Sequence, residues 1–171
     1  MEAVLVIDML HDFIAPDGRL SCGAAGAAIV PALQRELAAR RAAGDAVIYL
    51  CDSHRTDDAE FAMFPPHCLT GTKGAEIIPE LAPEAGDIRI TKRRYSGFFG
   101  TDLDITLREK GITRIHLTGV CTNICLLYTA ADARNLGYDV TVDRRFVASF
   151  DAAAHEWACK EMESTLGCTV I

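Results

Sequence analysis

Three features are scarce in this 171-residue sequence, and each scarcity excludes a class of protein. No apolar run approaches the roughly 18 residues that a membrane-spanning helix needs. Lys and Arg number 17 against 24 Asp and Glu, a net charge of −7, whereas proteins that bind nucleic acid present a basic face to the phosphates. The seven cysteines are odd in number and lack the spacing of a disulfide framework. We therefore expect no membrane partner, no nucleic acid partner and reduced thiols.

The first ten residues argue against secretion. MEAVLVIDML has an acidic residue where a signal peptide would carry a basic one, and its apolar run is too short for a signal. Free thiols persist in reducing compartments, so the composition predicts a cytoplasmic location. A small molecule is then the expected partner.

Short apolar runs alternate with amphipathic stretches along the whole chain. The runs predict strands at residues 3–8, 46–51, 87–91, 114–119, 139–143 and 168–171. The amphipathic stretches predict helices at residues 27–43, 103–110, 123–135 and 152–166, several of them closed by glycine. This alternation predicts an α/β fold: one domain over residues 1–171, three α/β/α layers and a six-stranded, mainly parallel, Rossmann-like sheet. Residues 52–86 predict a long loop with one short helix, and loops of that length are usually functional.

Reactive side chains follow four of the predicted strands. Asp8 ends the first strand, residues 51–54 (CDSH) follow the second, Lys92 follows the third, and Cys121 follows the fourth, with Cys125 one turn further on. Taken singly, Asp8 could cap a helix, Lys92 could be solvated and Cys125 could be a buried thiol. Ligands of open parallel sheets bind beyond the carboxyl ends of the strands. The occurrence of all these reactive side chains at that one edge therefore favours a functional site.

Cys121 and Cys125 lie four residues apart in GVCTNIC, which allows three interpretations: a metal clamp, a redox pair, or one reactive thiol beside a bystander. A zinc site would need two further thiol or imidazole ligands at matching spacing, and the familiar redox pair has two intervening residues. If Thr122 or Asn123 caps the next helix, Cys125 lies in its first turn. There the helix dipole, aided by Lys92, would lower the pKa of the thiol. We therefore expect Cys125 to be the nucleophile and Cys121 to offer its backbone N–H to an oxyanion.

A second group of side chains has the composition of a metal site. Its members are Asp52, His54, Glu60 and His67. Asp52 and His54 should point the same way, because side chains alternate along an extended segment. Two imidazoles and two carboxylates without a thiolate suit a divalent ion: Zn first, with Mn and Fe as alternatives. Asp57 and Asp58 compete with Glu60 for the fourth place. In the other interpretation, Asp52 and His54 cap a turn and His67 lies on the surface.

Four segments of the chain resemble one enzyme family. They are DMLHDF (8–13), FPPHCLTGTKGAE (64–76), KRRYSGFFGTDLD (92–104) and GVCTNICLLYTAADARNLGYDV (119–140). In this order they resemble the isochorismatase-like cysteine hydrolases, most closely the pyrazinamidase/nicotinamidase branch. The resemblance implies an Asp8–Lys92–Cys125 triad, an oxyanion hole formed by the amides of Cys121 and Cys125, and a cis peptide between Val120 and Cys121.

The same resemblance implies a substrate and a pocket. Asp52, His54 and His67 match the metal ligands of nicotinamidases, and Glu60 matches a ligand that varies between His and Glu in that family. Phe13, Phe64 and Tyr95 should line the pocket for a flat ring; Phe64 stands where many members have Trp. The expected reaction is hydrolysis of nicotinamide to nicotinate and ammonia. The alternatives are another small amide, or a non-catalytic metal- or ligand-binding protein on this scaffold. Self-association as a homo-oligomer is common in the family.

Overall fold

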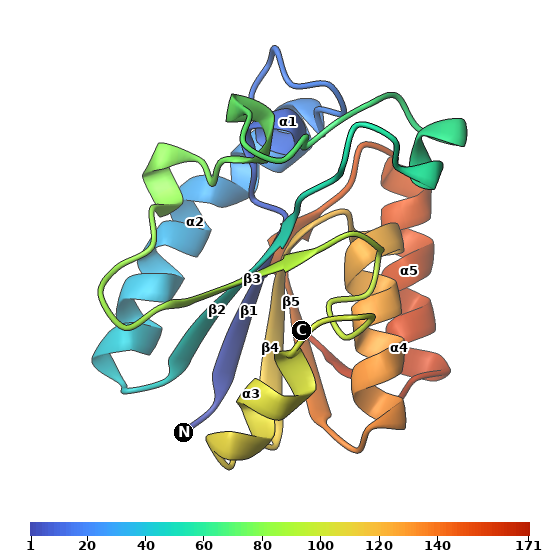
Figure 1. Cartoon of the computed structure of the whole chain (residues 1–171). Coiled ribbons are helices and arrows are strands. Elements are labelled where there is room, and N and C mark those ends of the chain that lie inside the picture. The colour runs from blue at the N-terminus through green and yellow to red at the C-terminus, as the bar shows by residue number, and fades with distance from the viewer.

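A six-stranded sheet forms the centre of the molecule in the computed structural model, which describes residues Met1–Ile171 (Figure 1). The strands are β1 (Ala3–Ile7), β2 (Ala46–Asp52), β3 (Ile88–Lys92), β4 (Arg114–Val120), β5 (Asp139–Ala148) and β6 (Thr169–Val170). Their order is β3-β2-β1-β4-β5-β6, and every neighbouring pair is parallel. The predicted sheet is thus confirmed and is parallel throughout. The strand order reverses between β1 and β4, where α/β sheets open a crevice for ligands.

Helices cover both faces of the sheet. They are α1 (His11–Ile14), α2 (Gly23–Ala42), α3 (Leu103–Glu109), α4 (Leu127–Asn135) and α5 (Ala152–Ser164). Figure 1 shows α2 on one side and α4 with α5 on the other. Alternate residues of β1 feed two cores: Leu5 packs in the core with α3, α4 and α5, whereas Val4 and Val6 pack in the core with α1 and α2. The three-layer prediction is confirmed.

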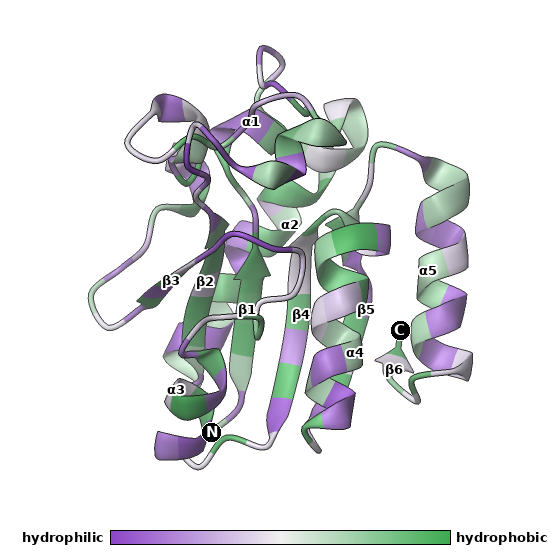
Figure 2. Ribbon diagram, turned by 45° about the vertical axis from the view of Figure 1, so that its right-hand side comes forward, coloured by the Kyte–Doolittle hydropathy of each residue, from purple (hydrophilic) through white to green (hydrophobic).

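Hydropathy follows these layers. Figure 2 shows apolar residues along β1 and mixed colouring on α5, whose outer face meets solvent. This is the pattern expected when a parallel strand is buried on both faces and a helix on one. No helix of the molecule is long and apolar enough to cross a membrane.

Several element boundaries differ from the prediction. β5 extends to Ala148 because its pairing with β4 resumes, at Gly119 with Val147, after a bulge; the exposed pair 144–145 made the strand look finished earlier. α2 begins at Gly23 and contains Pro31 in its interior. The loop at 52–86 carries three single-turn helices rather than one. They are η1 (Ala59–Ala62), η2 (Lys73–Ala75) and η3 (Pro79–Leu81).

Gly119 allows β4 to approach β1 next to the site-bearing strand ends. Its φ is +108°, and a Cβ at this position would lie 2.0 Å from the carbonyl oxygen of Ile7. Glycine alone meets both demands, because it tolerates positive φ and has no side chain. The next peptide bond, between Val120 and Cys121, is cis, as the family resemblance implied.

We expect Gly119→Ala to lower the free energy of unfolding by more than about 4 kcal/mol, because the new methyl group must push β1 and β4 apart. Gly86→Ala is the matched control: its φ is +100°, but its Cβ would meet nothing within 4 Å. That variant should lose only about 1–2 kcal/mol for the backbone conformation. Urea denaturation of both proteins measures the difference, and equal losses would show that the close approach of the strands does not matter.

Candidate active site

A buried ammonium group occupies the centre of the site. Lys92 is the last residue of β3, and its side chain is fully buried, with 0% exposed. Its Nζ lies 2.6 Å from Oδ1 of Asp52, 2.8 Å from Oδ2 of Asp8 and 3.4 Å from Sγ of Cys125. Burial opposes the charge, but the two carboxylates outweigh it and raise the pKa of Lys92 well above its ordinary value. The predicted triad residues therefore do meet, around a permanent ammonium ion.

Asp8 follows β1 directly and has an unusual backbone, with φ at +53°. A positive φ is uncommon outside glycine and often marks functional positions. Its Oδ1 accepts a hydrogen bond from the backbone N–H of Asp52 at 2.9 Å. Burial and the nearby carboxylate of Asp52 raise the pKa of Asp8 to about 6, although Lys92 opposes this. Asp8 is then ionised at neutral pH, yet is a stronger base than an exposed aspartate.

Cys125 lies in η4 (Thr122–Leu126), a π-helical turn that leads into α4. Such turns are rare and occur frequently at functional sites. The cap expected at Thr122 or Asn123 is wrong: Cys121 is the N-cap and makes no capping side-chain bond. The hydroxyl of Thr122 instead lies 2.9 Å from Nδ1 of His155, and Oδ1 of Asn123 accepts from Ser149 at 2.6 Å. Both side chains thus anchor the turn to neighbouring elements.

The pKa of Cys125 also differs from the expectation. Burial raises the pKa of this thiol well above its ordinary value, and the carboxylates of Asp8 and Asp52 add to the rise while Lys92 opposes it. The environment of this buried thiol therefore opposes the low pKa expected from a helix dipole. A base must then take its proton during attack. An oxygen of Asp8, an oxygen of Asp52 and Sγ of Cys125 all lie within 4.8 Å of one another.

Cys121 has a different neighbour from Cys125. Its sulfur lies 3.4 Å from Sγ of Cys22, at the start of α2, and all seven cysteines are free thiols. This contact and burial raise the pKa of Cys121. Cys51 and Cys68 are buried in the core with α2, as expected for packing residues. The geometry thus favours one thiol next to Lys92, and not a pair formed by Cys121 and Cys125.

The four predicted metal ligands converge beside this centre. Nε2 of His54 lies 3.5 Å and Nε2 of His67 lies 3.8 Å from Oδ2 of Asp52. Oε1 of Glu60 lies 4.0 Å from the first of these nitrogens and 3.9 Å from the second. Four ligand atoms held tetrahedrally by zinc are about 3.3–3.6 Å apart, given bonds of roughly 2.0–2.2 Å. The four separations above are close to that value, and ligand atoms of Asp52, His54 and His67 all lie within 4.8 Å of one another. Asp52 and His54 do point the same way.

Both imidazoles present the nitrogen that a metal would need. Nδ1 of His67 lies 2.8 Å from the carbonyl oxygen of Pro65, and Nδ1 of His54 lies 3.2 Å from Oδ2 of Asp58. Metal-binding histidines are usually held in this way through their second nitrogen. Nε2 of His54 is buried without any hydrogen-bond partner. A buried polar atom of this kind is costly unless another group, such as a metal ion, binds it.

The charges of the site also fit a divalent cation. Asp8, Asp52 and Glu60 are all buried and face one ammonium, that of Lys92. Ionised, they leave an excess of two negative charges, which is unfavourable at low dielectric. Accordingly, burial and the Asp52 carboxylate raise the pKa of Glu60. The donor set and the charge together fit an ion such as zinc.

An apolar pocket joins the two clusters. It is lined by Asp52, Glu60, His67, Cys121 and Cys125 on its polar side. Its walls are Phe13, Leu20, Phe64, Tyr95, Ile124 and Phe150. The three predicted ring-binding residues are therefore present, and the Phe64 and Tyr95 rings meet edge to face with centroids 6.5 Å apart. No signal in the sequence points to Leu20, Ile124 or Phe150, because nothing chemical distinguishes them from the other apolar residues of the chain.

Solved structures of similar sequence are hydrolases. The pyrazinamidase/nicotinamidase of Streptococcus mutans is 38% identical, with a TM-score of 0.95 and 100% of both chains covered. The pyrazinamidase of Pyrococcus horikoshii, solved in complex with zinc, is 31% identical, with a TM-score of 0.94, 99% of this chain and 98% of that one covered. Fold and site thus define a hydrolase that acts on amide C–N bonds.

The chain also matches a known protein family. A family model described as the isochorismatase domain matches residues 2–171, and the chain belongs to the isochorismatase family. The isochorismatase family protein PncA of Bacillus subtilis is 39% identical over 99% of this chain and 98% of its own length. The ureidoacrylate amidohydrolase RutB of Stutzerimonas stutzeri is 32% identical over 80% of this chain and 65% of its own length. The chain thus resembles enzymes that act on different amides.

We expect zinc to raise the melting temperature of the metal-free protein. A metal that binds the folded state alone should add roughly 5–10 °C at about 100 times its Kd. His67→Ala should abolish most of this shift, because it removes one of the converging nitrogens. His116→Ala is the matched control, since that imidazole lies on β4 beside Glu2 and Arg40. Thermal unfolding with and without zinc measures the shift; an equal shift in both variants would argue against this ligand set.

Proposed function

We propose that this protein is a nicotinamidase, a cysteine amidohydrolase that converts nicotinamide and water to nicotinate and ammonia. One observation carries the proposal: the same pocket, with aromatic walls, brings together the thiol of Cys125 and candidate metal ligands, and the ammonium of Lys92 links that thiol to the carboxylate of Asp8. The pocket offers a nucleophile for a carboxamide and flat apolar contacts for a ring. Zinc is the proposed ion, because the donors suit it and a similar pyrazinamidase was solved with zinc; Mn and Fe are the alternatives. The free thiols support a cytoplasmic location.

Catalysis would proceed through a thioester. Sγ of Cys125 attacks the carboxamide carbon while Asp8 takes the thiol proton. The raised pKa of Cys125 makes a base necessary, and the raised pKa of Asp8 makes it a better base. Collapse of the tetrahedral intermediate breaks the C–N bond, and Asp8 returns the proton to the departing ammonia. Asp8 then removes a proton from water, which attacks the thioester carbon. Collapse of this second intermediate breaks the C–S bond, Asp8 returns the proton to the departing sulfur of Cys125, and the released acid ionises to the carboxylate product.

Other groups would stabilise the charges that develop. The backbone N–H groups of Cys121 and Cys125 are the proposed donors to the oxyanion. The Lys92 ammonium keeps Asp8 oriented and compensates negative charge as the thiol proton leaves. Asp52, His54, Glu60 and His67 would hold the ion, which when bound supplies an electrophilic site for the ring nitrogen.

The lining of the pocket favours a neutral substrate over an anionic one. None of the residues that line it is Arg or Lys. The ammonium of Lys92 is committed to two carboxylates, and Arg93 and Arg94 pair with Asp58. A substrate with its own carboxylate, such as ureidoacrylate, would find no free Arg or Lys side chain in the pocket to pair with it. A neutral heteroaromatic carboxamide avoids this cost.

We expect Cys125→Ala to lower kcat for nicotinamide hydrolysis by at least about 10⁴-fold, because it removes the nucleophile. Cys121→Ala should keep most of the activity, since alanine retains the backbone N–H at this position. Ammonia release under saturating substrate measures both. Comparable losses in the two variants would contradict the assignment of Cys125 as the only reacting sulfur.

We expect nicotinamide to exceed benzamide in kcat/KM by about 10²-fold or more, because benzamide lacks the ring nitrogen and would leave the polar end of the pocket unpaired. Ammonia release across nicotinamide, pyrazinamide, benzamide and ureidoacrylate tests this selectivity. Equal rates for benzamide would mean that the ring nitrogen is not recognised. A preference for ureidoacrylate would replace the proposed function with that of the other relatives.

A further inference from the structure

Asp58 is a buried carboxylate that the reaction does not use. Its side chain is 0% exposed, and it does not line the pocket. Its Oδ2 lies 3.2 Å from Nδ1 of His54 and accepts a hydrogen bond from Nε of Arg93 at 3.0 Å. Its Oδ1 accepts from the backbone N–H of Glu60 at 3.1 Å and from Nη1 of Arg94 at 3.0 Å. Asp58 thus contacts two of the four candidate ligands from outside the cluster.

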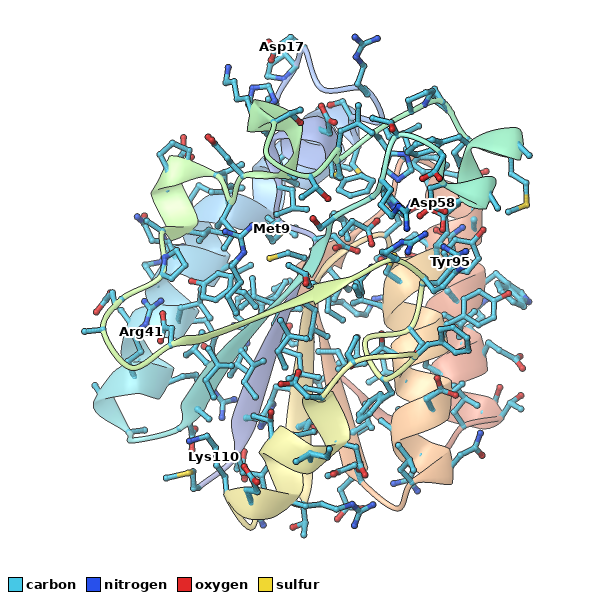
Figure 3. The ribbon with its side chains drawn as sticks, in the orientation of Figure 1. Met9, Asp17, Arg41, Asp58, Tyr95 and Lys110 are labelled. Carbon is cyan, nitrogen blue, oxygen red and sulfur yellow. The ribbon has the colours of Figure 1, made fainter.

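The surroundings of Asp58 hold it in one place. Arg93 and Arg94 directly follow Lys92 and precede Tyr95, and Figure 3 shows Asp58 and Tyr95 at the same upper corner of the molecule. The backbone N–H of Glu60, the imidazole of His54 and both arginines all converge on this one carboxylate. The two guanidinium groups also compensate its charge, so Asp58 adds no further excess to the negative metal cluster.

We propose that Asp58 is the positioning residue of the metal centre: it keeps the proton of His54 on Nδ1, so that the lone pair of Nε2 faces the ion, and it fixes the backbone of Glu60. The carboxylate–imidazole contact and the unpartnered Nε2 on the same ring carry this assignment. Without Asp58, the imidazole is free to rotate or to carry its proton on the other nitrogen. The inference rests on the proposed metal site, and not on the identity of the substrate.

The metal affinity of variant proteins tests this role. The Kd for zinc is measured by competition with a chromophoric chelator, for the wild type and for Asp58→Ala and Asp58→Asn. We expect a loss of about 10–100-fold in Asp58→Ala. Asp58→Asn keeps an oxygen that can accept the Nδ1 proton but loses the charge, so its loss should be smaller. Asp57→Asn is the matched control: it removes the same charge one residue earlier, where the side chain is 68% exposed and pairs with Arg55, and it should not change the Kd.

A second measurement separates positioning from a merely structural role. Thermal unfolding of the metal-free proteins reports whether each variant still folds, and the visible spectrum of the cobalt-loaded proteins reports the ligand geometry. A higher Kd for zinc, together with an altered cobalt spectrum, in a variant that still folds supports the inference. Unchanged zinc affinity in both Asp58 variants overturns it, even if their melting temperatures fall. A wild-type protein that binds no zinc, manganese or iron overturns the metal site itself, and nicotinamide hydrolysis by that protein would then stand as a separate result.

Discussion

The ammonium of Lys92 is the interaction on which both halves of the site depend. It lies between Asp8 and Asp52 at 2.8 and 2.6 Å, with the sulfur of Cys125 at 3.4 Å. Removing one partner of a buried ion pair costs about 3–5 kcal/mol, because the remaining charge is uncompensated. Here one cation serves two carboxylates from two different strand ends. The three strands β1, β2 and β3 are therefore joined at their carboxyl ends by charge as well as by backbone hydrogen bonds.

Asp52 makes the thiol centre and the metal cluster one unit. Its Oδ1 accepts from Lys92, and its Oδ2 faces the nitrogens of His54 and His67. A charge on the histidine side of this carboxylate interacts with the groups on its Lys92 side, and the reverse, because a buried site has a low effective dielectric. A divalent ion beside Asp52 would compete with Lys92 for its negative charge and leave more of the ammonium field for Asp8 and Cys125. In the proposed mechanism, substrate positioning and nucleophile activation would be electrostatically linked through this one side chain.

The sequence was sufficient for the fold class and for the residues with distinctive chemistry. The alternation of apolar runs gave the parallel sheet, and the strand-end position of Asp8, Lys92 and Cys121 gave the edge where the site lies. The environment of Cys125 could not be predicted, because its pKa depends on burial and on carboxylates 117 and 73 positions away in the chain. The role of Asp58 could not be predicted either, since sequence spacing does not tell a carboxylate that binds a metal from one that holds a histidine. The end of a strand can be recognised from a short stretch of sequence, whereas side-chain packing depends on residues that are far apart in the chain.

The position of β1 in the sheet has a consequence for how the chain folds during synthesis. β1 pairs with β2 along one edge, but its other partner is β4, in register from Ala3 with Ile115 to Ile7 with Gly119. β1 therefore keeps one edge open until β4, which follows it by more than 100 residues, has been made. An open apolar edge is a site for wrong pairing, and parallel pairs of high sequence separation form slowly. Covering this open edge of β1 early, for example by a chaperone, would therefore improve the yield of folded protein.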